Sequence, residues 1–401
     1  MIKKLIAKNF WSFDNIELSF ESNVLGLWGA NGSGKTNVLR IISYLRHIIG
    51  GGQILPNNTN NTKFFDVINK NGIYTPCRFN KDNKPIILSI SFIVGDKSYD
   101  YMIEYNNENI ILEEINMISH NVIISKKYNK TTKNHTIIIK KDNKLLNKEY
   151  RINKETEGSY KEYTLFKYVL EAIKDSDIKD DLINLVIYWK NITTNVSFDN
   201  SIDVPIAKNA SNISQYILSE NKKEDIKISM TKYRDLLDLK DIGLYDINIS
   251  STNMDNKTII KGIHKKGKKE VVLDFFEQES MGTQALFMVF YYIVKSLESG
   301  AVLAMDEIGQ YIHPLIMERI IGYFMDKDCN KNNAQLLFTT HNINTLTLLE
   351  RYQTAFVNKE DGISEVYLMS DIEGTNDEID VGAKKIARYL AGRYGGIPEY
   401  K

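Results

Sequence analysis

The first part of the chain shows the alternation of apolar and polar residues that is typical of strands. Ile16, Leu18 and Phe20 alternate with polar residues, and the apolar run Val24-Leu25-Gly26-Leu27-Trp28 follows. The alternation predicts a half-buried strand, and the short apolar run predicts a second one. A helix is expected over residues 37–49, which begin with the run Asn37-Val38-Leu39-Arg40-Ile41-Ile42. The chain therefore opens with β structure that leads into a helix.

The middle of the chain changes from strands to helices. Residues 86–117 predict an antiparallel meander with a turn at Gly95-Asp96, and a second β ribbon is expected over about 121–153. From about 157 to 239 the apolar residues are spaced for helices, with one face in 165–173 and another in 182–189. No heptad pattern is sustained there, so a long coiled-coil arm is not expected. The simplest interpretation is an inserted helical subdomain.

The last part returns to strands and then alternates with helices. Strands are expected within 243–274, followed by a helix over 285–297, an apolar strand over 301–305 and a helix over 314–326. Another buried strand begins at Gln335, two strands lie near 354–358 and 364–369, and a final helix spans about 381–393. We therefore divide the chain into an N-terminal lobe at 1–156, a helical insert at 157–240 and a C-terminal lobe at 241–401.

One stretch between strand and helix carries recognisable chemistry. It reads Gly29-Ala30-Asn31-Gly32-Ser33-Gly34-Lys35-Thr36, which is the phosphate-loop pattern G-x-x-x-x-G-K-[ST], and Asn37 follows it. Glycines let backbone N–H groups approach phosphate oxygens, and the helix N-terminus adds partial positive charge. Lys35 is expected to contact the β- and γ-phosphates, and the Thr36 hydroxyl to bind Mg²⁺. The sequence therefore predicts a site for ATP and Mg²⁺.

A second motif fits the same chemistry. The apolar strand Val302 to Met305 ends in Asp306-Glu307. Asp306 is expected to hold Mg²⁺ through water, and Glu307 to polarise the water that attacks the γ-phosphate. Apolar residues followed by two acids form a weak signal alone, but together with the phosphate loop the signal is strong.

Two further positions are candidates for the site. Ser280, with Gly282 and Thr283 behind it, precedes a predicted helix and offers a hydroxyl and free N–H groups to a phosphate. Ser280 would serve equally well as an ordinary N-cap. His341 follows Thr339-Thr340 at the end of a predicted strand, where open α/β sheets bind ligands. It could contact the γ-phosphate, although a histidine at a strand end is more often structural.

In this order, the motifs G-x-x-x-x-G-K-T, E-S-x-G-T, apolar-D-E and T-T-H-N resemble the head domain of ABC-type ATPases, in the branch of RecF and the SMC heads. Within that branch the chain resembles the stand-alone ATPases of the RloA/AbiL group, whose relatives include AriA of the PARIS phage-defence system. The resemblance also rests on Asp306-Glu307-Ile308-Gly309-Gln310-Tyr311-Ile312-His313-Pro314, on Phe338-Thr339-Thr340-His341-Asn342 and on Gly392-Arg393-Tyr394-Gly395-Gly396-Ile397-Pro398. It implies an α/β P-loop NTPase fold of the ABC-ATPase head type, with an antiparallel β subdomain and an inserted helical subdomain.

The resemblance also implies how such a protein works. Two heads would sandwich ATP, with Ser280, Gly282 and Thr283 of one copy acting across a homo-oligomer on the phosphate loop of the other. Family members serve in phage defence beside a separate toxin or nuclease, so a separately encoded effector is expected. At the signature around Ser280 the chain departs from transporter ATPases, which carry L-S-G-G-Q. Transporter ATPases also have a glutamine that couples the nucleotide to other parts of the protein, and Gln53 is a doubtful candidate for it.

Composition indicates where in the cell the protein is expected to work. The chain has 401 residues and 51 residues of each charge sign, so its formal net charge is zero and gives no global attraction to nucleic acid or membrane. No apolar run reaches the roughly 18–20 residues of a membrane helix, and the lysine-broken N-terminus is not expected to be a signal peptide. The two cysteines, Cys77 and Cys329, lack metal-like spacing and are expected to be reduced thiols. A cytoplasmic location is therefore expected.

Two alternatives to an ATP-hydrolysing switch stay open. One is a RecF-like repair ATPase that contacts DNA phosphates through the lysine-rich ribbon at 126–151, although such a ribbon is also compatible with a solvated hairpin. The other is a scaffold that binds ATP without hydrolysing it. The aromatics of Asn9-Phe10-Trp11-Ser12-Phe13 could stack on a nucleotide base, but capping of the sheet is favoured because buried aromatics usually serve packing.

Overall fold

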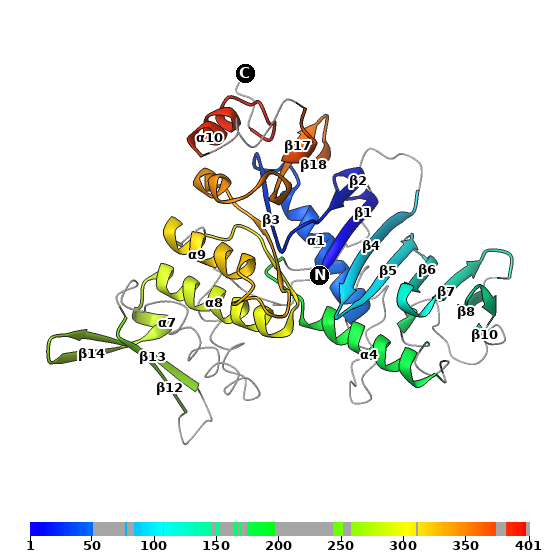
Figure 1. Cartoon of the computed structure of the whole chain (residues 1–401), viewed down its shortest axis with the longest axis horizontal. Coiled ribbons are helices and arrows are strands. Elements are labelled where there is room, and N and C mark those ends of the chain that lie inside the picture. The colour runs from blue at the N-terminus through cyan, green and yellow to red at the C-terminus, as the bar shows by residue number, and fades with distance from the viewer. Residues whose placement is uncertain are drawn as a thin grey trace.

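The structure is a computed structural model that describes residues 1–50, 77, 84–106, 108–132, 134–145, 150–152, 164–166, 169, 173, 175–196, 244–251, 258–309, 312–373 and 382–397. Over these residues the chain is a mixed α/β protein, with a large antiparallel sheet, a mainly parallel sheet and a small antiparallel sheet (Figure 1). The predicted α/β class is confirmed.

The large sheet follows the order β10-β8-β7-β6-β5-β4-β1-β2, and β9 pairs with β8. The predicted meander at 86–117 is confirmed as three consecutive antiparallel strands. The predicted second ribbon does not stand apart, because β7 pairs with β6 and continues the same sheet. The strands are β1 (Ile2–Phe10), β2 (Phe13–Ser19), β4 (Ile86–Val94), β5 (Lys97–Tyr105), β6 (Ile110–Met117), β7 (Val122–Asn129), β8 (Asn134–Lys141), β9 (Lys144–Leu145) and β10 (Tyr150–Ile152).

Lys126 corrects part of the prediction for the basic ribbon. Its side chain is fully buried in the sheet, with Glu113 as the register partner on the neighbouring strand. Burial lowers the pKa of Lys126 and raises the pKa of Glu113, while the charge of each partner acts in the opposite direction. The Glu113 carboxylate also accepts hydrogen bonds from Tyr101 and from the Leu165 backbone. Lys126 therefore cannot contact a phosphate backbone.

The mainly parallel sheet lies at the centre of the molecule and has the order β11-β15-β16-β3-β17-β18. Neighbouring strands are parallel except for β17 and β18, so β3, β15 and β16 end at one edge. The strands are β3 (Val24–Gly29), β11 (Thr193–Thr194), β15 (Val302–Met305), β16 (Gln335–Thr339), β17 (Thr354–Glu360) and β18 (Ile363–Leu368).

Helices cover both faces of this sheet. Leu25 and Leu27 of β3 join the apolar cluster that contains α1, whereas Val24 and Trp28 join the cluster that contains α8 and α9. Alternate residues of a strand point to opposite faces, so the apolar run is buried on both sides. The helices are α1 (Lys35–Leu45), α4 (Ser176–Asn191), α7 (Phe275–Gln278), α8 (Met281–Ser299), α9 (Pro314–Met325) and α10 (Ala383–Leu390). Short 3₁₀ or π turns are η1 (Arg46–Gly50), η2 (Ile118–His120), η6 (Ile343–Leu348), η7 (Arg351–Gln353) and η8 (Met369–Asp371).

The segment 176–196 differs from the prediction of a helical insert. Its residues form α4 and then β11, and β11 pairs in parallel with β15 of the central sheet. Burial explains the difference, because the apolar face of α4, including Leu182, Leu185 and Trp189, belongs to the main core. The other parts of 157–240 lie largely outside the described residues.

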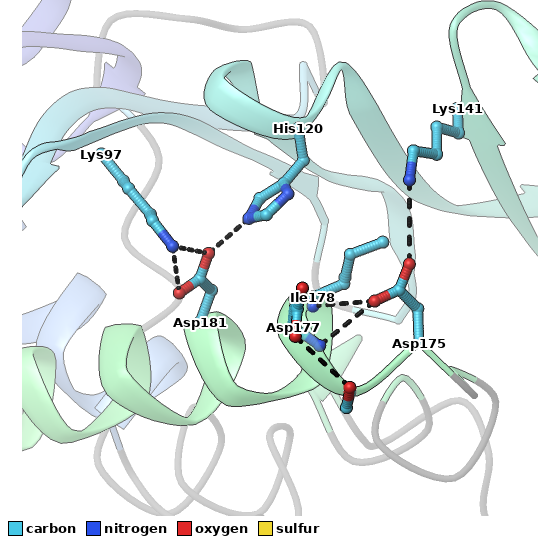
Figure 2. A network of polar contacts seen from close by, with 8 residues as sticks. Lys97, His120, Lys141, Asp175, Asp177, Ile178 and Asp181 are labelled. Atoms are coloured by element: carbon cyan, nitrogen blue, oxygen red, sulfur yellow. Dashed lines mark hydrogen bonds and ion pairs between the residues drawn. The ribbon is translucent and has the colours of Figure 1, made fainter.

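Polar contacts fix α4 against the large sheet (Figure 2). The Asp181 carboxylate accepts hydrogen bonds from Lys97 Nζ at 2.6 and 2.7 Å and contacts the His120 ring. Burial alone would raise the pKa of Asp181, but the bonds from Lys97 and His120 outweigh it and the pKa lies below its ordinary value. Asp175 caps the helix by accepting from the Asp177 and Ile178 backbones. The start of α4 is therefore anchored through charge.

The small sheet is formed by β12 (Asp246–Ser251), β13 (Thr258–Lys266) and β14 (Lys269–Asp274), as the strand pattern at 243–274 predicts. In Figure 1 it projects from the body below α7 and α8. The helix predicted at 285–297 begins earlier, at Met281, because Ser280 is its N-cap.

Three predictions concern single side chains. Phe10 and Phe13 are fully buried, and Phe10 packs edge-on against Tyr44 at 5.1 Å, so these aromatics serve packing as favoured. Both cysteines are free, with Cys77 buried and Cys329 exposed. Among the described residues, no helix is long and apolar enough to cross a membrane.

Candidate nucleotide-binding site

The phosphate loop lies between β3 and α1, and its glycines are required by the backbone. Gly32 and Gly34 have φ of +75° and +115°, values that other residues rarely adopt. A Cβ on Gly29 would lie 2.4 Å from the carbonyl oxygen of Val357, and one on Gly34 would lie 2.7 Å from Ser364 Oγ. The loop is therefore a close-fitting backbone cradle at the N-terminus of α1, as the motif requires.

Serines from outside the motif support the loop. Ser364 Oγ lies 2.5 Å from the carbonyl oxygen of Ser33, which accepts its hydrogen bond, and 2.8 Å from Ser12 Oγ. Asn37 Nδ2 also donates to Ser12 Oγ, at 2.8 Å. These contacts join β18, the β1–β2 turn and α1. Sequence reasoning missed Ser12 and Ser364, because nothing in the local pattern distinguishes them from other serines.

Lys35 lies inside the loop. Its Nζ donates to the carbonyl oxygens of Gly29 and Ala30, each at 2.9 Å, and the side chain is buried. Burial lowers the pKa of Lys35, while the negative charges of Asp306 and Glu307 act to raise it. A cation is thus held among polar groups at the edge where β3 ends, where it can attract an anion.

Thr36 and Asp306 are brought together although 270 residues separate them along the chain. Thr36 Oγ1 donates to Asp306 Oδ2 at 2.9 Å, and Thr339 Oγ1 donates to Asp306 Oδ1 at 2.6 Å. Hydroxyl and carboxylate oxygens are the ligands that Mg²⁺ prefers. The ends of β3, β15 and β16 therefore meet at Asp306, where Thr36 and Asp306 offer oxygen ligands and Thr339 holds the carboxylate.

Glu307 has an unusual backbone conformation. Its φ is +52°, in the left-handed region, which costs a non-glycine residue about 1–3 kcal/mol. Two contacts with β16 hold this conformation: the Glu307 N–H donates to Thr339 Oγ1 at 2.7 Å, and the Ile308 N–H donates to the Thr339 carbonyl at 3.1 Å. Thr339 thus positions both acids of the motif.

Asn195, directly after β11, holds Asp306 from the other side. Its Oδ1 accepts from the Asp306 N–H at 2.6 Å, and its Nδ2 donates to the Asp306 carbonyl at 2.8 Å. One amide side chain therefore satisfies both backbone groups of the acid. Sequence reasoning missed Asn195, because a strand of two residues carries no periodic signal.

His341 lies near the phosphate loop, as predicted from its position after β16. Together with Gly29, Ala30, Asn31 and Tyr389 it lines a cavity of about 370 Å³. Partial burial and the nearby Lys35 charge lower the pKa of His341 below its ordinary value, while Glu307 and Asp306 act to raise it. Tyr389, from α10, was not predicted as part of this region.

Ser280 has the ordinary structural role in the single chain. Its Oγ accepts from the Thr283 N–H at 3.1 Å and lies 2.8 Å from Thr283 Oγ1, so it caps α8. The start of α8 lies beside α7 and apart from the β3–α1 turn (Figure 1). The chain therefore does not bring Ser280, Gly282 or Thr283 to its own phosphate loop. Ser280 is exposed, and Met281 beside it is 61% exposed.

The residues present fit a nucleoside triphosphate with Mg²⁺. The glycine cradle leaves room for phosphate, Lys35 supplies positive charge, and Thr36 with Asp306 supplies oxygen ligands. Ser33 Oγ is buried with no hydrogen-bond partner among the described residues. In the same part of the chain no cluster of three or more His, Cys, Asp or Glu residues forms a protein cage for a metal. Mg²⁺ in nucleotide sites typically needs no such cage, because phosphates and water complete its shell.

Comparisons with known proteins identify the family of the chain. Over 49 residues the chain is 45% identical to the uncharacterized protein MJ1542 of Methanocaldococcus jannaschii, a match that spans 12% of this chain and only 6% of that relative. The SMC head domain from Thermotoga maritima is 14% identical, with a TM-score of 0.44 over 92% of this chain and 98% of that one. The recombination mediator RecF of the RecFOR pathway is 13% identical, with a TM-score of 0.35 over 91% of this chain and 98% of that one. A family model described as "AAA domain, putative AbiEii toxin, Type IV TA system" matches residues 24–347, and the chain belongs to that family.

Proposed function

We propose that this protein is an ATP-hydrolysing switch. One observation carries the proposal: the Thr36 hydroxyl and the Asp306 carboxylate lie 2.9 Å apart at the edge of the sheet where Lys35 is also held. A cation, two oxygen ligands and a backbone cradle at a helix N-terminus form the combination that binds a nucleoside triphosphate with Mg²⁺. Membership of the AAA-domain family supports the same activity.

Each residue then has a role in hydrolysis. Lys35 and the loop N–H groups hold the β- and γ-phosphates, and Thr36 and Asp306 hold Mg²⁺, which when bound neutralises developing charge on the phosphates. Glu307 orients the attacking water and accepts its proton. His341 donates a hydrogen bond toward the γ-phosphate. The strained backbone of Glu307 supports its role, because such conformations cluster at functional sites.

Replacing Glu307 tests the proposal. Glu307→Gln should keep ATP affinity, since the phosphate loop is unchanged, but lower turnover at least about 100-fold because the base is lost. Phosphate release and binding of a fluorescent ATP analogue measure the two quantities, with Glu360→Gln on the exposed end of β17 as control. Wild-type turnover in Glu307→Gln would contradict the role of this residue. Absence of turnover in the wild type, with assembly driven by ATP alone, would favour a non-catalytic scaffold.

We further propose that the active form is a head-to-head ATP sandwich. Ser280, Gly282 and Thr283 would face the phosphate loop of a second copy. The exposure of Ser280 and Met281 supports this arrangement, because both are accessible to another molecule, whereas the Thr283 side chain is buried behind them. The Ser280 cap also leaves the first N–H groups of α8 directed outward, where they can meet a phosphate.

The biological role proposed is that of a cytoplasmic sensor in phage defence which controls a separately encoded toxin or nuclease. Its support is the resemblance of the motifs to the RloA/AbiL group and the description of the matched family, which names a toxin–antitoxin system. Co-expression with the product of the adjacent gene tests this role. A stable complex that ATP loosens or tightens, and protection against phage that Glu307→Gln abolishes, are the expected results. Unchanged phage sensitivity with and without the gene pair would exclude it.

A further inference from the structure

The hairpin formed by β13 and β14 carries a concentrated positive charge that the nucleotide site does not use. Its only acids are Glu270 and Asp274, and its tip is the sequence Lys265-Lys266-Gly267-Lys268-Lys269. All four tip lysines are exposed, as is Lys261 nearer the base. The chain has no net charge, so this is a local excess rather than a general property.

The register of the hairpin brings like charges together. Lys266 and Lys269 are directly opposite across a two-residue turn, in which Gly267 has φ of +63°. Like charges at opposed strand positions destabilise a hairpin. Lys265 is compensated, because it pairs with Glu270 at 3.3 Å and lies 4.3 Å above the Tyr245 ring. Among the described residues, Lys266, Lys268 and Lys269 make no ion pair. Folding alone does not account for these three charges.

The shape of the hairpin restricts the partner. β12 pairs with β13 only as far as Ile263, so beyond this residue β13 and β14 form a two-stranded ribbon, and Figure 1 shows its turn pointing away from the body. The major groove of a nucleic-acid duplex of B form admits a two-stranded β ribbon, and lysines on both strands would then meet phosphates on both walls. We propose that the β13–β14 hairpin is a docking site for duplex DNA, bound through its phosphates.

The base of the hairpin is connected to the start of α8. His264 Nε2 lies 2.7 Å from Glu279 Oε1, and a Cβ on Gly262 would lie 2.2 Å from the same oxygen, so β13 is in close contact with the residue before Ser280. Asp274, the last residue of β14, caps α7. If the proposed ATP sandwich forms through Ser280, DNA bound to the hairpin would change how readily the two heads close on ATP. This consequence rests on the proposed function, whereas the binding of DNA to the hairpin does not.

Salt-dependent binding tests the docking site. The probe is a short fluorescein-labelled DNA duplex of random sequence, and anisotropy is measured without nucleotide between about 50 and 200 mM salt. The hairpin variant is Lys266→Ala/Lys268→Ala/Lys269→Ala, and the control removes three exposed lysines of the large sheet, Lys130→Ala/Lys140→Ala/Lys144→Ala. The hairpin variant should bind at least about tenfold more weakly, with the slope of log K against log salt smaller by about 2–3. The control should bind like the wild type.

Several results would overturn the proposal. They are absence of binding at low salt, equal losses in the two triple variants, or hairpin-dependent binding of polyglutamate without binding of DNA. A second hairpin variant, Lys266→Gln/Lys268→Gln/Lys269→Gln, removes the same charges with longer polar side chains and so controls for altered strand propensity. An unchanged melting temperature shows that each hairpin variant is folded. Lys35→Ala should still bind DNA. Failure of ATP hydrolysis would therefore leave the docking result intact, and failure of docking would leave the ATPase proposal intact.

Discussion

At the scale of single residues, Asp306 is the most constrained group in the candidate site. Thr36 and Thr339 donate to its two carboxylate oxygens, and Asn195 holds its backbone N–H and carbonyl. The carboxylate can therefore neither rotate nor shift without breaking several hydrogen bonds. Such outer contacts usually matter to a metal site nearly as much as its ligands do.

We expect Asn195→Ala to raise the Mg²⁺ concentration that ATP turnover requires, although Asn195 is not placed to contact the nucleotide. Loss of the amide frees the backbone of Asp306, so the Mg²⁺ concentration for half-maximal turnover should rise about 10–100-fold. Titration of turnover with Mg²⁺ measures this, with Asn191→Ala at the end of α4 as control. An altered ATP affinity at saturating Mg²⁺ with an unchanged Mg²⁺ requirement would contradict a positioning role.

The buried pair of Lys126 and Glu113 gives a prediction about stability. Lys126→Met leaves the Glu113 carboxylate without its compensating charge in the core, which should lower the free energy of unfolding by about 3–5 kcal/mol. The double variant Lys126→Met/Glu113→Gln should recover much of this loss. Denaturant titration measures each value, and the exposed Lys127→Met should change it by less than about 0.5 kcal/mol. If Lys126→Met were as stable as Lys127→Met, Lys126 would not be buried as described.

At the scale of elements, sequence patterns predict the long strands and helices and miss what depends on tertiary contact. The loop after Val24–Trp28 and the acids after Val302–Met305 are local signals, so the nucleotide site could be expected before the fold was known. The strand β11 has only two residues and exists because β15 offers it a partner. Lys126 has the sequence of a surface lysine and is buried only because Glu113 lies across the sheet. The partner of β11 is distant in the chain, and the contact between Lys126 and Glu113, although it joins consecutive strands, depends on the pairing register.

The anchor of α4 gives a prediction that depends on pH. Asp181→Asn should lower the melting temperature by a few degrees, because the amide no longer compensates Lys97 and His120. The folded pKa of Asp181 lies below its ordinary value of 3.8, so the carboxylate stabilises the fold above about pH 4 and this contribution is lost as pH falls through the folded pKa. The difference between wild type and variant should therefore be constant from about pH 5 upward and shrink at lower pH.

Thermal unfolding at a series of pH values measures this difference in melting temperature. Asp180→Asn, at the exposed neighbouring position on α4, is the matched control and should show no such difference. A difference that grew toward low pH would have the wrong sign for a carboxylate with a lowered pKa and would exclude the anchor.

At the scale of the whole molecule, the two halves of the proposed catalytic site lie on separate parts of the surface. The phosphate loop is at the edge of the central sheet, and Ser280 is at the exposed start of α8. In a head-to-head dimer each chain would therefore supply the phosphate loop of one shared site and the Ser280 turn of the other. This arrangement allows two inactive variants to restore each other.

We expect mixtures of Lys35→Ala and Ser280→Asp to hydrolyse ATP although each variant alone does not. Aspartate still caps α8 but repels phosphate, so the fold is kept while the contact across the interface is lost. About half of random dimers pair the two variants and hold one intact site, so the mixture should reach about a quarter of wild-type turnover. Mixing Lys35→Ala with the double variant should give none. A mixture as inactive as its components would exclude a shared site.

The two cysteines provide a direct way to follow such assemblies. Cys77 is buried, whereas Cys329 is exposed in the turn after α9. Slight burial of the sulfur and the neighbouring Asp326 raise the pKa of the Cys329 thiol, so mildly alkaline buffer favours its reaction with a maleimide dye. Each chain then carries a single fluorophore. Counting photobleaching steps in single complexes would give the number of chains that ATP brings together, without any change to the sequence.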